Sequence, residues 1–182
     1  QGFFFFFFFV FLLLIFFQSR EFEIGRTSII PGILKSLRTN RSASLPLRLF
    51  QIDDVLLRDA SAETGARNER RVCAAYCNRS AGLENVHGLL DKVCQVVGMK
   101  LPSYTLKDSS CPTFFEGRCV SIHLRDDSVL GIMGVVHPLV LKAYQLPNPV
   151  SLFEINLEVL EKFENEDFLF AVDGFGECGE MM

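Results

Sequence analysis

The chain has 182 residues, of which 49% are hydrophobic and 22% charged, and it contains no tryptophan. This length and composition predict a single globular domain. Acidic residues outnumber basic ones by 22 to 18, and the net charge of −4 argues against a free-standing nucleic-acid binder held by phosphate neutralisation. Residues 19–71 are locally basic, since they carry ten basic and seven acidic side chains.

An unbroken run of Phe, Val, Leu and Ile fills residues 3–17 and is fifteen residues long. A membrane-spanning helix needs ~20 residues, and the basic residues and cleavage site that mark a secretory signal do not flank the run. Phe codons are pyrimidine-rich and Gln18 can be encoded by CAG, which together resemble the 3′ end of an intron. We interpret residues 1–18 as translated intron; a membrane anchor is the alternative.

The pattern of apolar residues then predicts the elements of the domain. Helices are expected at residues 29–37, 89–97 and 138–144. Strands are expected at residues 47–57, 70–77, 118–125, 129–136 and 151–157. Hairpins with helices between them favour an α+β fold, an antiparallel sheet flanked by helices, over a doubly wound parallel sheet. The domain is expected to span residues 19–160, and the acidic, aperiodic stretch 161–182 is expected to be disordered.

Several ordered blocks along the chain resemble a known family. The blocks that carry the resemblance are residues 26–37, 45–55, 65–71, 87–91, 112–118, 131–138 and 153–157. In this order they are similar to the C-terminal core of the beta subunit of phenylalanine–tRNA ligase, of the eukaryotic and archaeal cytosolic type. Ordered blocks are far more specific than any single motif.

The resemblance implies a class II aminoacyl-tRNA synthetase-like module that has lost its active site. A working module uses two arginines to hold ATP phosphates, because the reacting phosphorus needs fixed positive charge and Mg²⁺. Gln51 and Asp53 stand where the first arginine pattern would lie, and Gly131 and Gly134 lead into His137 without the second. No catalytic, cofactor-binding or metal residue is therefore assigned to this chain, and ATP and Mg²⁺ are expected only for the whole enzyme.

The resemblance also implies partners. The chain would be a structural fragment of a cytoplasmic (αβ)₂ enzyme that joins phenylalanine to its tRNA, with the catalytic sites on the alpha subunit and no membrane contact. The first helix carries an apolar stripe wider than one helical face, which predicts that part of it covers a partner subunit. The residues of this stripe are Ile29, Ile30, Ile33, Leu34 and Leu37.

Three further groups of residues have side chains that could take part in binding or chemistry. Arg67, Arg70 and Arg71 are candidates for contact with tRNA or a partner, or form a solvated loop end. Cys119, Ser121 and His123 share a strand face and suggest a small hydrolase as an alternative function. Same-face neighbours on one strand lie ~7 Å apart, however, which is too far for the hydrogen bond that a base must make. The six cysteines contain no Cys-x-x-Cys pair, so no structural zinc site is expected.

Overall fold

The computed structural model describes residues 25–99 and 104–161. Its centre is a six-stranded sheet in the order β1-β2-β6-β5-β4-β3, and every neighbouring pair is antiparallel. The strands are β1 (Leu47–Arg58), β2 (Ala66–Cys77), β3 (Tyr104–Asp108), β4 (Phe114–Leu124), β5 (Val129–Val136) and β6 (Val150–Asn156). The helices are α2 (Ile30–Thr39), α3 (Leu83–Val96), α4 (Pro138–Ala143) and α5 (Leu157–Glu161).

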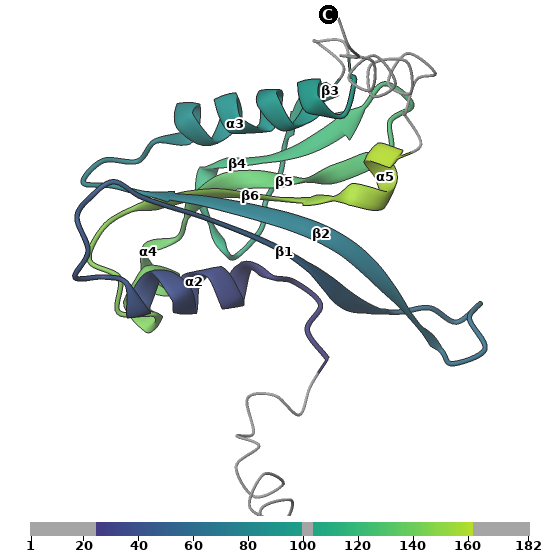
Figure 1. Cartoon of the computed structure of the whole chain (residues 1–182), viewed down its shortest axis with the longest axis horizontal. Helices are drawn as coiled ribbons and strands as arrows, with labels where there is room; N and C mark the ends of the chain where they lie inside the picture. Colours follow the sequence, from purple (N-terminus) through teal and green to yellow (C-terminus); the bar gives the residue numbers. More distant parts are fainter. Residues whose placement is uncertain (1–24, 100–103, 162–182) are drawn as a thin grey trace, which may run out of the picture.

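Helices cover both faces of the sheet, with α2 and α3 on opposite sides (Figure 1). The alternation along β2 shows why both faces are buried, because successive side chains of a strand point to opposite faces. Cys73 and Ala75 belong to the core beside α2, whereas Val72 and Ala74 belong to the core beside α3. The expected antiparallel sheet flanked by helices is confirmed.

The helix α2 corrects the expectation of a subunit interface. All five residues of its apolar stripe are buried in the domain's own core, none more than 7% exposed. The stripe is wide because apolar side chains from several elements surround the helix: Leu45, Leu47, Leu141 and Tyr144 pack against the same cluster as the sheet. These five residues therefore do not supply an exposed surface for a partner subunit.

Two elements were not predicted. The strand β3 lies at an edge of the sheet and four of its five residues are exposed, so its sequence lacks a buried alternation. The short helix α5 follows β6 directly, and only its first residue, Leu157, falls within the predicted strand 151–157. No helix within residues 25–99 and 104–161 is long and apolar enough to cross a membrane. The expectations for residues 1–18 and 162–182 lie outside the described residues.

Candidate functional site

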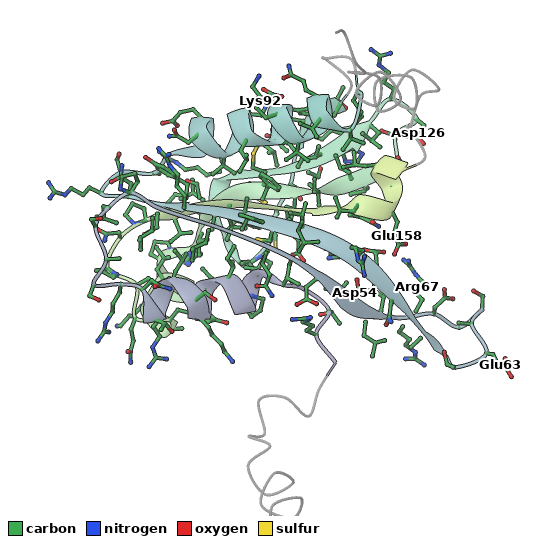
Figure 2. The ribbon with its side chains drawn as sticks, viewed as in Figure 1. Asp54, Glu63, Arg67, Lys92, Asp126 and Glu158 are labelled. Atoms are coloured by element: carbon green, nitrogen blue, oxygen red, sulfur yellow. The ribbon has the colours of Figure 1, made fainter. Side chains whose placement is uncertain are left out.

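The sheet face beside α2 is only partly covered by that helix. Beyond the start of α2, the face holds a pocket of about 590 Å³. Arg67, Glu69 and Arg71 line the pocket from β2, since residues two apart on a strand share a face, and Glu154 lines it from β6. Figure 2 shows Arg67 on the part of the β1–β2 hairpin that extends past α2. The lining of this pocket thus carries two arginines and two glutamates.

Two buried carboxylates line the pocket. Glu69 and Glu154 are each only 4% exposed. Arg71 Nε donates to Glu69 Oε1 at 2.7 Å, and Arg71 Nη1 lies 3.5 Å from Glu154 Oε1. Arg67 Nη2 lies 2.9 Å from Glu69 Oε2. A buried carboxylate is costly without a partner, so the two arginines neutralise charge that the fold itself has buried.

The second acid, Glu154, also connects the sheet to the start of α2. Its Oε2 accepts a hydrogen bond from Ser28 Oγ at 2.7 Å, and its Oε1 accepts one from the amide of Ile29 at 3.0 Å. Ser28 Oγ in turn accepts from the amide of Ile30 at 3.2 Å. The first backbone amides of a helix have no partner within the helix, so Glu154 and Ser28 together satisfy two amides at this helix start.

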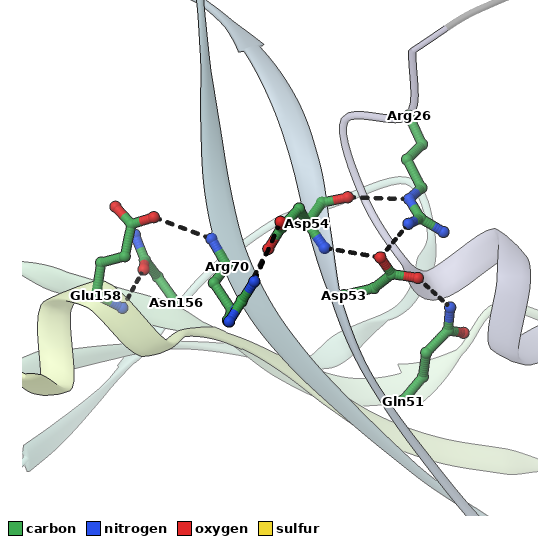
Figure 3. A network of polar contacts seen from close by, with 7 residues as sticks. All are labelled: Arg26, Gln51, Asp53, Asp54, Arg70, Asn156 and Glu158. Atoms are coloured by element: carbon green, nitrogen blue, oxygen red, sulfur yellow. Dashed lines mark hydrogen bonds and ion pairs between the residues drawn. The ribbon is translucent and has the colours of Figure 1, made fainter.

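The third candidate arginine, Arg70, points away from the pocket. It lies opposite Asp54 on β1, where its Nε donates to Asp54 Oδ1 at 2.8 Å (Figure 3). This hydrogen bond lowers the pKa of Asp54 below its ordinary value. The backbone amide of Arg70 donates to Glu158 Oε1 at 3.0 Å. Arg67 and Arg71 therefore share one face and Arg70 the other, and their contact with tRNA or a partner stays a prediction.

The residues at the positions of the two missing arginines do not lie together in one site. Asp53 lies on β1 in an ion pair with Arg26, and Gln51 Nε2 donates to Asp53 Oδ2 at 3.3 Å (Figure 3). Gly131 lines the charged pocket, whereas His137 caps α4 by accepting a hydrogen bond from the amide of Leu139 at 3.1 Å. Within the described residues no three His, Cys, Asp or Glu side chains are grouped to hold a metal ion.

The structure does not support the hydrolase alternative. Cys119 is buried, and this burial raises the pKa of its thiol, which disfavours the nucleophilic thiolate. His123 Nε2 lies 3.0 Å from Ser121 Oγ, so the argument that strand neighbours on one face are too far apart to hydrogen-bond is wrong for this pair. The two side chains lean toward each other, and the strand spacing alone did not show this.

Sequence reasoning missed both buried acids. Glu154 had a signal, because it is the single acid in the apolar run of β6, and a lone charge among buried positions needs a partner elsewhere. Glu69 lies between charged and polar residues and had no such signal. In the fold Glu69 is buried together with its ion pairs to Arg67 and Arg71.

Solved structures share this fold. Two solved structures of the pyrrolysyl-tRNA synthetase of Desulfitobacterium hafniense are similar to 82% of this chain, with a TM-score of 0.57 and 17% sequence identity. The similarity covers 49% of one of those chains and 50% of the other. At this identity the likeness shows the fold alone, which is that of an aminoacyl-tRNA synthetase-like module.

The family follows from sequence comparison. Residues 13–157 match the family described as the phenylalanyl tRNA synthetase beta chain CLM domain, and the chain belongs to this family. The phenylalanine–tRNA ligase beta subunit of Drosophila melanogaster is 47% identical over 144 residues, which are 76% of this chain and 24% of the relative. The human beta subunit is 42% identical over 77% of this chain and 24% of its own length. The chain thus spans about a quarter of the curated relatives it matches.

A plant relative adds a cellular location to the comparison. The Arabidopsis thaliana protein is named as a cytoplasmic phenylalanine–tRNA ligase beta subunit, and it is 33% identical over 156 residues. That match covers 79% of this chain and 26% of the relative. The location belongs to the relative's name and bears on this chain only as support for a proposal.

Proposed function

We propose that this chain is the C-terminal, non-catalytic core of a phenylalanine–tRNA ligase beta subunit. In this role it supports the ATP-dependent attachment of phenylalanine to tRNA by assembling with a catalytic alpha subunit in a cytoplasmic (αβ)₂ enzyme. The observation that carries the proposal is the family match over residues 13–157. ATP and Mg²⁺ would serve the whole enzyme, with no site for either in this domain.

The charged pocket supports a non-catalytic role. Stabilising a reacting phosphate requires positive charge directed at the substrate. Arg67 and Arg71 are instead directed at Glu69 and Glu154, which are buried and require them. A phosphate entering this pocket would meet two carboxylates as well as two guanidinium groups, so its attraction to the pocket is largely cancelled.

A chimera tests the assembly role directly. Residues 19–160 of this chain would replace the matching segment of the Drosophila beta subunit, which is 47% identical. We expect the chimera to co-purify with the Drosophila alpha subunit and to charge tRNA with phenylalanine. A matched control replaces the same segment with the equivalent part of the pyrrolysyl-tRNA synthetase, which shares the fold at 17% identity, and should fail to assemble. A chimera that is soluble and folded but behaves like this control would contradict the proposal.

The non-catalytic role has a separate test. The purified chain, free of any alpha subunit, should show no phenylalanine-dependent exchange of pyrophosphate into ATP. Exchange above the level of a heat-denatured sample would show an active site in this chain and overturn that part of the proposal.

A further inference from the structure

The strand β1 is an edge of the sheet, and its backbone shows which groups face outward. In an antiparallel pair, alternate residues exchange both hydrogen bonds with the partner strand. The amide of Leu56 donates to the carbonyl of Arg26 at 2.8 Å, and the carbonyl of Asp54 accepts from Arg26 Nε at 3.0 Å. Arg26 lies outside the sheet, so the even-numbered residues of β1 direct their N–H and C=O groups away from β2.

One half of this edge is closed by local contacts. At Asp54 the outward amide donates to Asp53 Oδ1 at 2.9 Å, while Arg26 takes the outward carbonyl (Figure 3). At Leu56 the outward amide is taken by the Arg26 carbonyl. Groups that satisfy an edge in this way prevent another strand from pairing there.

The other half is open. The outward N–H and C=O groups of Arg48, Phe50 and Ile52 make no hydrogen bond to any residue in the described ranges 25–99 and 104–161. Pro46, the next outward position, has no N–H to offer. The open edge is therefore a five-residue segment, bounded by proline on one side and by the Asp53–Arg26 contacts on the other.

Large apolar side chains stand beside these open groups. Phe50 is 75% exposed and Ile52 is 54% exposed, and both point to the sheet face that carries α3. A hollow of about 280 Å³ runs from Phe50 to Val86 and Leu89 of α3. An exposed apolar edge with free backbone groups is a template for strand addition.

We propose that the open edge of β1 pairs with the same edge of a second copy of this chain, antiparallel and centred on Phe50. This register places Phe50 opposite Phe50 of the other copy and Arg48 opposite Ile52. It uses only the outward groups of residues 48, 50 and 52, which are the groups left open. The two sheets would become one continuous sheet across a two-fold axis.

Self-complementarity favours a second copy over a foreign strand. The open segment extends two residues to each side of Phe50, so a two-fold axis there matches every open donor with an open acceptor. The same register sets Arg48 of each copy diagonally across from Asp54 of the other, where it would join the ion pair that Asp54 makes with Arg70. A ladder this short lies below the size of stable interfaces, which bury ~1,200–2,000 Å², so the dimer should dissociate on dilution.

Cysteine cross-linking of the full chain tests the register. Directly opposed Cα atoms lie ~5.5 Å apart, within reach of a disulfide, so the F50C variant should form a covalent dimer under mild oxidation. The I52C variant should not, because the two copies of position 52 are offset by four residues, ~13 Å along the strand. The L56C variant, on the closed half of the same edge, controls for random collision, and the wild-type chain gives the background from native cysteines.

The linked peptide is identified by mass spectrometry after digestion. A disulfide between two copies of position 50, at least ten times more abundant than the I52C and L56C products, supports the proposal. Equal cross-linking of all three variants indicates non-specific association and overturns it, as does a dimer without the position-50 link. A chain that captures another protein through this edge, with no self-link, also overturns it.

Lysine variants test the same edge without oxidation. Ile52→Lys adds a charge to the open edge, a change that natural sheets use to block pairing. In sedimentation velocity, under reducing conditions, it should weaken self-association at least tenfold, whereas Leu56→Lys on the closed half should not. Equal behaviour of the two lysine variants would show that β1 is not the interface.

Discussion

The two halves of the sheet face beside α2 are built from the same strands but differ in what covers them. Under the helix, β2 contributes Cys73 and Ala75, which are small and fully buried in an apolar core. Past the helix start, the same face of β2 carries Arg71, Glu69 and Arg67 around a pocket. The alternation is continuous across both halves, so strand periodicity alone does not decide whether a face becomes core or pocket.

The two halves differ in the electrostatic cost of burying their side chains. The covered half needs no partners, because apolar side chains lose only water on burial. The open half contains acids that are nearly as buried as the core, and each acid is paired. Glu154 lies at the boundary and contacts both halves, through α2 on one side and Arg71 on the other.

The largest effect is expected in the covered half. Leu34→Ala removes a fully buried side chain of α2 and should lower the free energy of unfolding by about 2–5 kcal/mol. Leu89→Ala is the matched control, because Leu89 is exposed on α3, and it should change stability by less than about 0.5 kcal/mol. Chemical denaturation of the chain measures both. Equal losses would mean that α2 does not pack as the structure shows.

The second-largest loss of stability is expected at Glu154, which lies at the boundary between the two halves. Glu154→Gln keeps the shape of the side chain but removes its charge, and leaves one of its donors without an acceptor. We expect a loss of about 1–3 kcal/mol in the free energy of unfolding. Glu116→Gln, an exposed position on β4, is the control and should be neutral. A double-mutant cycle with Arg71→Gln should show coupling between positions 71 and 154; strictly additive losses would place Glu154 outside the network.

A smaller loss is expected at the outer end of the pocket. Arg67→Ala removes a half-exposed partner of Glu69, which keeps its hydrogen bond to Arg71. The free energy of unfolding should fall by less than about 1 kcal/mol, and the difference should shrink in high salt. Arg71→Ala, which deprives both buried acids of a partner, should cost clearly more. If the two variants lose the same amount in denaturation experiments, the buried acids are not held mainly by Arg71.

The smallest effect lies at the β1 edge, outside both halves. The amide of Asp54 and the Arg26 side chain lower the pKa of Asp53 from its ordinary 3.8. Because the folded pKa is depressed, this contribution to stability is complete above pH 3.8 and is lost as pH falls through the folded value. In a plot of melting temperature against pH, Asp53→Asn should therefore make the decline on the acid side slightly less steep. Asp53→Ala removes the acceptor of the Asp54 amide, so amide exchange at Asp54 should become faster in this variant, and unchanged exchange would show that Asp53 does not protect this edge.

Much of the fold was readable from sequence, because its signals are local. The alternation in β2 and the helical spacing of α2 predicted both elements. The same spacing was read wrongly when the width of the α2 stripe was assigned to a partner, since sequence does not show that Leu141 and Tyr144 pack onto the same cluster. β3 was missed because an exposed edge strand has no apolar period.

The candidate site was less readable, because it depends on residues far apart in the chain. Arg71 and Asn156 are neighbours across two strands, and Glu154 reaches Ser28, yet no sequence pattern relates them. The three candidate arginines look alike in sequence, but strand alternation sends Arg70 to one face and its neighbour Arg71 to the other. The pairing of β2 with β6 brings Arg71 to Glu154, whereas Glu69 lies on β2 between the two arginines of the pocket.

The pairing of β2 with β6 also sets the order in which the chain can fold as it is synthesised. Arg71 pairs with Asn156, and Cys77 pairs with Val150, so one side of β2 stays without its neighbour until nearly all of the domain has been made. Contacts this distant in sequence close slowly. On the ribosome, the β1–β2 hairpin and α3 can form early, but the charged pocket and the start of α2 wait for β6. A nascent chain stopped before residue 150 would therefore expose the backbone of β2 to chaperones and proteases.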